Sequence, residues 1–269
     1  MSVDRSWLVA ALACAVLSGL MSGCTIPPAP LGETRDRITA SDETDASKRG
    51  RVRMELASAY FGRGQLTTAL DEVKMAIAIN PGMGEAYNLR GLIYAGLGDD
   101  QLAQESFKRA LQLNPHDGDA MHNYAWYLCQ QKSYGPAQTL FDQALALPQY
   151  QSGVRTLLAS GVCQARAGLW AEAETTLMRA YERDPANPAT AVNLSEVLLH
   201  QGAYERARFY MRRVNGVKDQ SNAQTLWLAA RIEMKLGNRQ GANEYGLQLR
   251  DRFPQSRESS AFDRGQFDE

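Results

Sequence analysis

The sequence predicts an all-α protein, built as a superhelical solenoid of about six helix–turn–helix units. Two observations lead to this expectation. Ala and Leu are abundant, whereas Pro is sparse and stands mostly where helices should stop, which is typical of a helical chain. One amphipathic helix pattern also recurs, as in "GQLTTALDEVKMAIAINP" from Gly64 to Pro81 and "GDDQLAQESFKRALQLNP" from Gly98 to Pro115.

The charge balance argues against a nucleic-acid partner. The 269 residues include 29 basic and 30 acidic side chains, for a formal net charge of -1. A protein that binds nucleic acid usually carries a basic face or has a high pI. We therefore expect no nucleic acid among its partners.

Residues 1–23 have the features of a lipoprotein signal peptide. An apolar run from Trp7 to Leu20 is too short for a comfortable membrane span and fits the core of a secretory signal. The segment ends in "LMSGC", which resembles a bacterial lipobox with Cys24 as the lipidated residue. A plain signal peptide, or a short anchor, that ends in Cys is the alternative. In such lipoproteins Asp after the Cys favours the inner membrane, so Thr25 favours the outer membrane.

Two polar segments flank the repeats. Residues 24–48 are rich in Pro, Thr, Ser, Asp and Glu, and they contain few large apolar side chains. Such a segment buries too little surface to offset its ordering entropy, so we expect a flexible tether. The same reasoning predicts a polar tail over residues 255–269. The six repeats then occupy residues 49–254.

The repeats align on an Ala that begins each second helix. Most units have a Gly five residues earlier, which permits the left-handed backbone that ends a first helix, but unit three has Lys132 there. Most units have a large apolar residue four positions later, whereas unit six has Gly246. The aligned positions, 34 to 36 residues apart, are Ala69, Ala103, Ala137, Ala173, Ala207 and Ala242.

The second unit resembles the tetratricopeptide repeat, a helix–turn–helix motif of about 34 residues. The resemblance implies that the units stack, because none of them can bury its apolar stripe alone. It also implies that the first helices line an extended binding surface. The residues on the signature positions of the family are Tyr87, Gly91, Tyr94, Gly98, Ala103, Phe107, Ala110 and Pro115.

The sequence gives little sign of catalytic chemistry. It has three His and contains no H-E-x-x-H, G-x-S-x-G or P-loop motif. His122 falls on the expected inner face, where a binding or merely solvated His is more common than a catalytic one. We expect no enzyme activity, no cofactor and no metal site. The alternative is a peptidoglycan or proteolytic enzyme whose site is assembled from distant residues.

Two cysteines remain for the folded protein. Cys14 is lost with the signal peptide, and Cys24 is the expected lipid site. Cys129 and Cys163 fall in the first helices of units three and four, which are neighbours in this fold. Two remaining cysteines in an exported protein favour a disulfide. Two buried reduced thiols are the alternative, since Cys packs well as a small hydrophobe.

The resemblance also places an inner wall, because the family lines its groove with one stripe of each first helix. On this chain the stripe is apolar and lacks the Lys and Asn cluster that some relatives use to clamp a carboxylate. Exposed apolar patches usually mark partner sites, which predicts a protein-binding groove. Packing of these side chains between helices is the alternative. The expected groove residues are Leu92, His122, Trp126, Leu158, Val162, Val192, Leu199, Trp227 and Met234.

The last unit carries a more specific resemblance. Its "LGNRQGANEYGLQLRDRFPQS" is similar to the end of the type IV pilus biogenesis lipoproteins of the PilF/PilW family. That resemblance implies an outer-membrane lipoprotein that faces the periplasm and promotes localisation and multimerisation of the pilus secretin. Its implied partners are the secretin or other type IV pilus proteins, and the membrane through the lipid anchor. The alternative is an adaptor for another envelope machine, in cell-wall synthesis or outer-membrane protein assembly.

Overall fold

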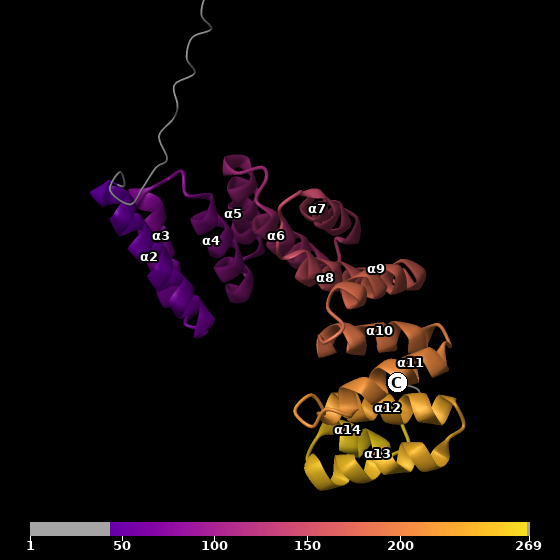
Figure 1. Cartoon of the computed structure of the whole chain (residues 1–269). Helices are drawn as coiled ribbons and strands as arrows, with labels where there is room; N and C mark the ends of the chain where they lie inside the picture. Colours follow the sequence, from indigo (N-terminus) through magenta and orange to yellow (C-terminus); the bar gives the residue numbers. More distant parts are fainter. Residues whose placement is uncertain (1–43, 268–269) are drawn as a thin grey trace, which may run out of the picture. The chain divides into compact units, whose positions relative to one another are not determined.

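The computed structural model describes residues 44–267, and within that range every regular element is an α-helix. Figure 1 shows these helices arranged as successive hairpins. In chain order the helices are α2 (Asp45–Gly62), α3 (Leu66–Ile79), α4 (Gly84–Leu97), α5 (Asp100–Leu113), α6 (Gly118–Gln130), α7 (Tyr134–Ala146), α8 (Gly153–Arg166), α9 (Trp170–Arg183), α10 (Pro188–His200), α11 (Tyr204–Asn215), α12 (Ala223–Lys235), α13 (Arg239–Arg252) and α14 (Arg257–Asp263).

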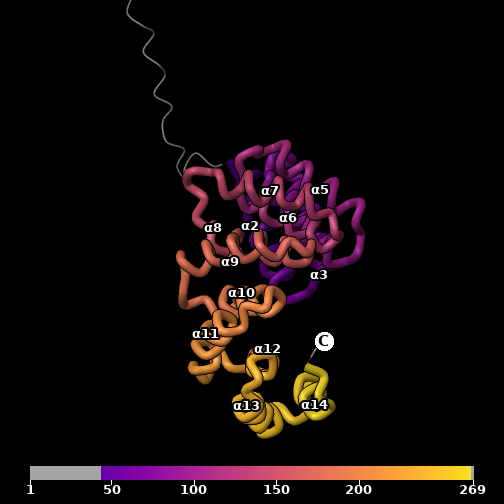
Figure 2. Tube along the Cα trace, turned by 90° about the vertical axis from the view of Figure 1, so that its right-hand side faces the viewer, coloured from indigo at the N-terminus to yellow at the C-terminus, as the bar shows by residue number. Residues whose placement is uncertain are grey.

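Six antiparallel pairs, from α2/α3 to α12/α13, form the expected helix–turn–helix units. The two helices of each pair make the most extensive contacts, and each pair packs on the next. The first helices from α4 to α12 also contact one another in sequence, so they form a continuous row. The Cα trace in Figure 2 passes through the same hairpins and ends with α14 against α12 and α13. The expected all-α repeat architecture is therefore confirmed.

The turns inside the hairpins depend on a left-handed residue. Gly98 ends α4 with φ 80° and ψ 15°, and its backbone N–H donates to the last turn of that helix. Lys132 takes the same role in unit three with φ 59°, the only non-Gly residue with positive φ among residues 44–267. A side chain there is strained but allowed. This conformation explains why the repeat tolerates the missing Gly.

Small residues let the paired helices approach closely. Ala103 and its five equivalents are fully buried. A Cβ added to Gly91 would lie 2.7 Å from the ring of Phe107, so a larger residue would have to displace that ring. At Gly246, where the repeat lacks its large residue, an added Cβ would overlap the ring of Phe262. Phe262 thus fills from outside the repeat the place that Phe107 fills in unit two.

The prediction of a polar tail over residues 255–269 was wrong for its first half. Residues 257–263 form α14, and Ser256 caps its N-terminus, because its Oγ accepts a hydrogen bond from the N–H of Ser259. Phe262 is buried against Leu226 and Leu249, so α14 closes the last hairpin. The polar composition of this segment gave no sign of a helix, because only the buried Phe262 ring and the Ser256 cap hold α14 in place.

The expected tether also ends earlier than residue 48. α2 begins at Asp45, and the N–H of Ser47 donates to Oγ1 of Thr44 at 3.1 Å. The signal peptide, Cys24 and most of the tether lie outside the described residues. Within residues 44–267, no helix is long and apolar enough to cross a membrane.

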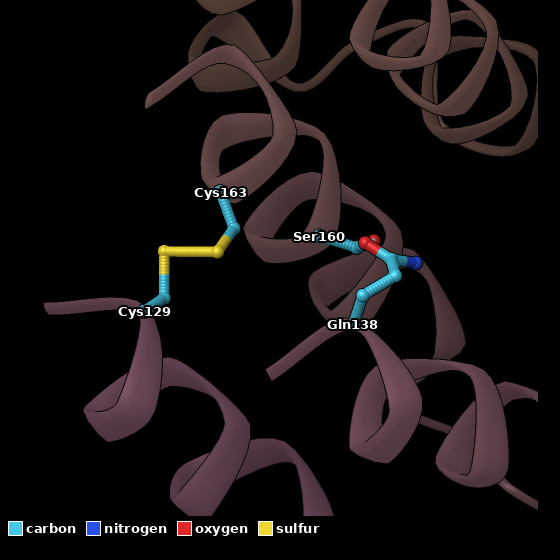
Figure 3. The surroundings of a disulfide bond; sticks show 4 residues. All are labelled: Cys129, Gln138, Ser160 and Cys163. Carbon is cyan, nitrogen blue, oxygen red and sulfur yellow. A yellow bond between two sulfur atoms is a disulfide. The ribbon is translucent and has the colours of Figure 1, made fainter. Parts of the chain in front are cut away.

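A disulfide joins the third and fourth hairpins. Cys129 in α6 and Cys163 in α8 are almost fully buried, their Cα atoms are 5.8 Å apart, and their sulfur atoms are bonded (Figure 3). A hydrogen bond from Oγ of Ser160 to Oε1 of Gln138, 3.3 Å long, links the same two hairpins nearby. The row of first helices is therefore covalently tied between α6 and α8.

Removal of this disulfide should destabilise the protein. We expect the double variant Cys129→Ala, Cys163→Ala to lose about 2–5 kcal/mol of unfolding free energy, because the link no longer restricts the unfolded chain. Urea unfolding of the two proteins under oxidising conditions measures the loss. Wild type in reductant is the matched control and should approach the double variant. Two free thiols found by alkylation of the native protein would contradict the pairing.

Candidate protein-binding groove

The expected groove residues form a half-buried row on the first helices. Seven of the nine keep part of their side chain exposed, and we call these seven residues the inner wall. They come from α4, α6, α8, α10 and α12, whose mutual contacts keep the row continuous. The inner wall consists of Leu92, Trp126, Leu158, Val162, Val192, Trp227 and Met234.

Five of the seven inner-wall side chains pack in part on the core clusters between helices. Leu92 and Trp126 pack on a core cluster that includes Phe107 and Phe141, and Leu158 packs on the cluster around α10. The packing alternative is thus correct for the inward part of these residues. The outward part remains available to a partner.

Trp126 and Arg166 form the most distinctive pair of this surface. The guanidinium carbon of Arg166, at the end of α8, lies 4.9 Å from the centre of the Trp126 ring on α6. A cation over an aromatic face at this distance is attractive. The contact holds a flat apolar ring beside an exposed positive charge. A partner segment with an aromatic or acidic side chain would complement this pair.

Next to this pair lies a hollow of about 280 Å³ between α8, α9 and α10. Trp170 supplies one side, and its ring stacks on the imidazole of His200 with centroids 4.2 Å apart and planes 13° apart. The size of the hollow suits one or two side chains of a partner better than a whole small molecule. Residues around the hollow include Val162, Arg166, Trp170, Asn193, Glu196 and His200.

Sequence reasoning missed the role of Trp170. Trp170 begins a second helix, outside the stripe expected to line the groove, and part of its ring packs on the core around α10. The stack with His200 joins a second helix to the first helix of the next unit. A search restricted to one stripe of the first helices could not find this contact. The paired positions of Trp170 and His200, 30 residues apart, were the available signal.

His122 does not belong to the groove, contrary to the expectation. It is 7 % exposed, and its Nδ1 makes a 2.9 Å hydrogen bond with Oγ1 of Thr156 in the next hairpin. Its pKa is lowered from 6.5 to about 4, mainly by burial and also by the charge of Arg155, while Asp119 partly opposes the shift. The ring is therefore neutral near pH 7 and acts as a contact between hairpins. Leu199 is likewise buried, at 8 % exposed.

Trp227 lies on the inner wall but is covered in part by the end of the chain. The Phe262 and Phe267 rings both pack on it, with the Phe267 centroid 5.2 Å away. The open part of the inner wall therefore runs from α4 to α10. Within residues 44–267, no group of three or more His, Cys, Asp or Glu side chains is arranged to hold a metal ion.

Comparison with known families supports the repeat assignment. Models of the tetratricopeptide repeat match residues 84–117, 131–188 and 164–232. These ranges include Cys163 and the helices around the hollow, and they leave out α6, which carries Trp126 and Cys129. The matches cover hairpins two, four and five and the second helix of hairpin three, and they end within α12 of hairpin six.

Similar proteins come from type IV pilus systems. The type IV pilus assembly protein PilF of Pseudomonas aeruginosa is 24% identical over 209 residues, which span 78% of this chain and 82% of that protein. The crystal structure of PilW, a widely conserved type IV pilus biogenesis factor, superposes with a TM-score of 0.75 at 29% identity over 79% of this chain and 97% of PilW. The structure of P. aeruginosa PilF gives 0.72 at 23% identity over 82% of this chain and 100% of that structure.

The buried His122 should make stability depend on pH. The unfolded chain takes up a proton near pH 6.5, whereas the folded chain does so only near pH 4, so stability falls as pH falls through this window. The loss attributable to His122 should reach about 3 kcal/mol at pH 4. Urea unfolding between pH 7 and pH 4 measures it.

The variant His122→Gln, which cannot take up a proton, should show a shallower decline than wild type. His116, exposed in the turn before α6, provides the matched control, and His116→Gln should keep the wild-type slope. Identical slopes for wild type and His122→Gln would show that folding does not lower the pKa of His122.

Proposed function

Because this chain is a tetratricopeptide-repeat protein homologous to PilF, we propose that it is a type IV pilus biogenesis factor. It acts as a scaffold that binds the pilus secretin and promotes localisation and multimerisation of that secretin at the outer membrane. The observation that carries the proposal is the match to PilW, which combines 29% identity with a TM-score of 0.75 over 97% of that chain.

The binding surface in this proposal is the open part of the inner wall. Trp126 with Arg166 and the adjoining hollow provide two flat rings, a cation and a carboxylate within three consecutive hairpins. Trp and Arg are enriched among residues that carry binding energy, because they offer large area with a polar handle. An extended segment of the secretin that crosses α6, α8 and α10 would contact all of these groups.

The proposal includes an anchor in the outer membrane. Cys24 carries the lipid, Thr25 favours the outer membrane, and the tether lets the hairpins face the periplasm. A disulfide between Cys129 and Cys163 supports an oxidising compartment such as the periplasm.

Loss of the Trp126–Arg166 pair should weaken secretin binding. We expect Trp126→Ala to lower secretin affinity about thirtyfold, since truncation of such an anchor often costs about 2 kcal/mol. Arg166→Ala should also lower secretin affinity. Because the Arg166 side chain is exposed, this variant should fold normally, so a loss of affinity would report on binding. Heat-resistant secretin multimer on a gel and binding to the purified secretin are the measurements, alongside melting curves.

Phe209→Ala is the matched control. Phe209 is 55% exposed on α11, a second helix away from the inner wall, so its loss should leave multimer and affinity unchanged. Normal multimer with Trp126→Ala and Arg166→Ala would reject this part of the wall as the secretin site. Capture of a different envelope machine from extracts, without secretin, would favour the adaptor alternative.

The anchor has its own test. We expect Cys24→Ser to give a folded protein that is released from the outer-membrane fraction, because more than one acyl chain is needed for stable anchoring. Fractionation in a strain without the secretin measures this, and Cys14→Ser in the signal region is the matched control. Retention of Cys24→Ser in the membrane fraction would contradict lipidation.

A further inference from the structure

The end of the chain folds back onto the last first helix. Gly265, with φ 67°, follows α14 in a left-handed conformation that reverses the backbone. Its N–H donates to the carbonyl of Phe262, and the N–H of Gln266 donates to the carbonyl of Ala261. These bonds direct the next residue, Phe267, back toward α12.

Phe267 is held on the inner wall by two kinds of contact. Its ring lies 5.2 Å from the Trp227 ring and 5.6 Å from the Phe262 ring, measured between centroids. Its carbonyl oxygen accepts a 3.3 Å hydrogen bond from Nε of Arg231. One aromatic ring and one backbone carbonyl are groups that any extended peptide with an aromatic residue can offer.

Trp227 and Arg231 occupy the same helical face, because four residues separate them. They stand on α12 where Val192 and Glu196 stand on α10, so they belong to the same row of first helices. Beside Trp227 lies a hollow of about 540 Å³ lined also by Arg257 and Arg264, so the site opens to one side. A partner segment that follows the row would reach this place after α10.

The contacts that hold Phe267 are weaker than those that hold α14. Phe262 is 8 % exposed and inserts beside Gly246, whereas Phe267 is half-buried and its backbone is held to α12 by a single hydrogen bond. Segments with few buried contacts open at small free-energy cost. α14 is thus firmly packed on the last hairpin, whereas residues 264–267 can leave Trp227 and Arg231 more easily.

We infer that Trp227 and Arg231 form a binding site for an extended protein segment with a phenylalanine or similar ring, and that residues 264–267 are its built-in competitor. The inference rests on the proposed function only in taking the partner to be a protein. When a site is open in only a fraction of the molecules, its apparent affinity for a ligand is reduced in proportion to that fraction. Removal of the competitor should therefore strengthen binding at this place.

The test uses the full chain and a short probe. The probe is a synthetic peptide with the sequence of residues 263–267, acetylated and amidated, and a second peptide has Ala in place of its Phe. Calorimetric titration should show that Phe267→Ala binds the probe at least about fivefold more tightly than wild type. Gly265→Ala, which keeps the ring but strains the reversal, should also bind more tightly than wild type.

Two controls and two outcomes decide the inference. Phe267→Ala combined with Trp227→Leu should lose the probe, and the Ala peptide should bind to none of the proteins. Equal affinity of wild type, Phe267→Ala and Gly265→Ala would overturn the competitor role, and equal binding of both peptides would overturn recognition of the ring. The assay contains no secretin, so its failure is distinct from failure of the Trp126 and Arg166 variants in multimer formation.

Discussion

The structure depends on close helix contacts at positions where the side chain is small or absent. Gly91 and Gly161 accept the Phe107 and Leu177 side chains directly against their backbones. Because each hairpin buries only part of its apolar surface by this contact, the next hairpin has to cover the rest. The continuous row of first helices is a consequence of that stacking, and the binding surface exists only where the stack does.

The repeat period made the fold predictable. The places where the chain departs from that period were not predictable. Spacing alone located the six hairpins, since the same small and large positions recur about every 34 residues. Gly246 was visible as an irregularity, but its partner Phe262 lies beyond the last period and in a polar segment. A residue outside the period cannot be aligned with anything, so the packing of α14 required three-dimensional information.

The sequence predicted which face of each first helix lines the groove, but not which side chains on that face are buried. Residues on one face of a helix can lie at the centre or at the edge of its contact with the next hairpin. The packing of that hairpin determines which of these side chains are buried. Thr156 and Phe141 enclose His122, although its position on α6 is equivalent to that of the half-exposed Leu158 on α8. Contacts between units, such as Arg166 on Trp126, depend on the same geometry and escape a search within one repeat.

The middle of the inner wall and its end at α12 are held by interactions of different strength. Near Trp126, a disulfide joins α6 to α8, and both cysteines are buried, so the ring and its cation sit on a cross-linked frame. A frame that is ordered before binding loses less entropy on association. At Trp227 a half-buried Phe267 covers the wall through one hydrogen bond and ring contacts. The middle of the wall is therefore cross-linked and open, whereas Trp227 at the α12 end becomes fully open only when Phe267 leaves it.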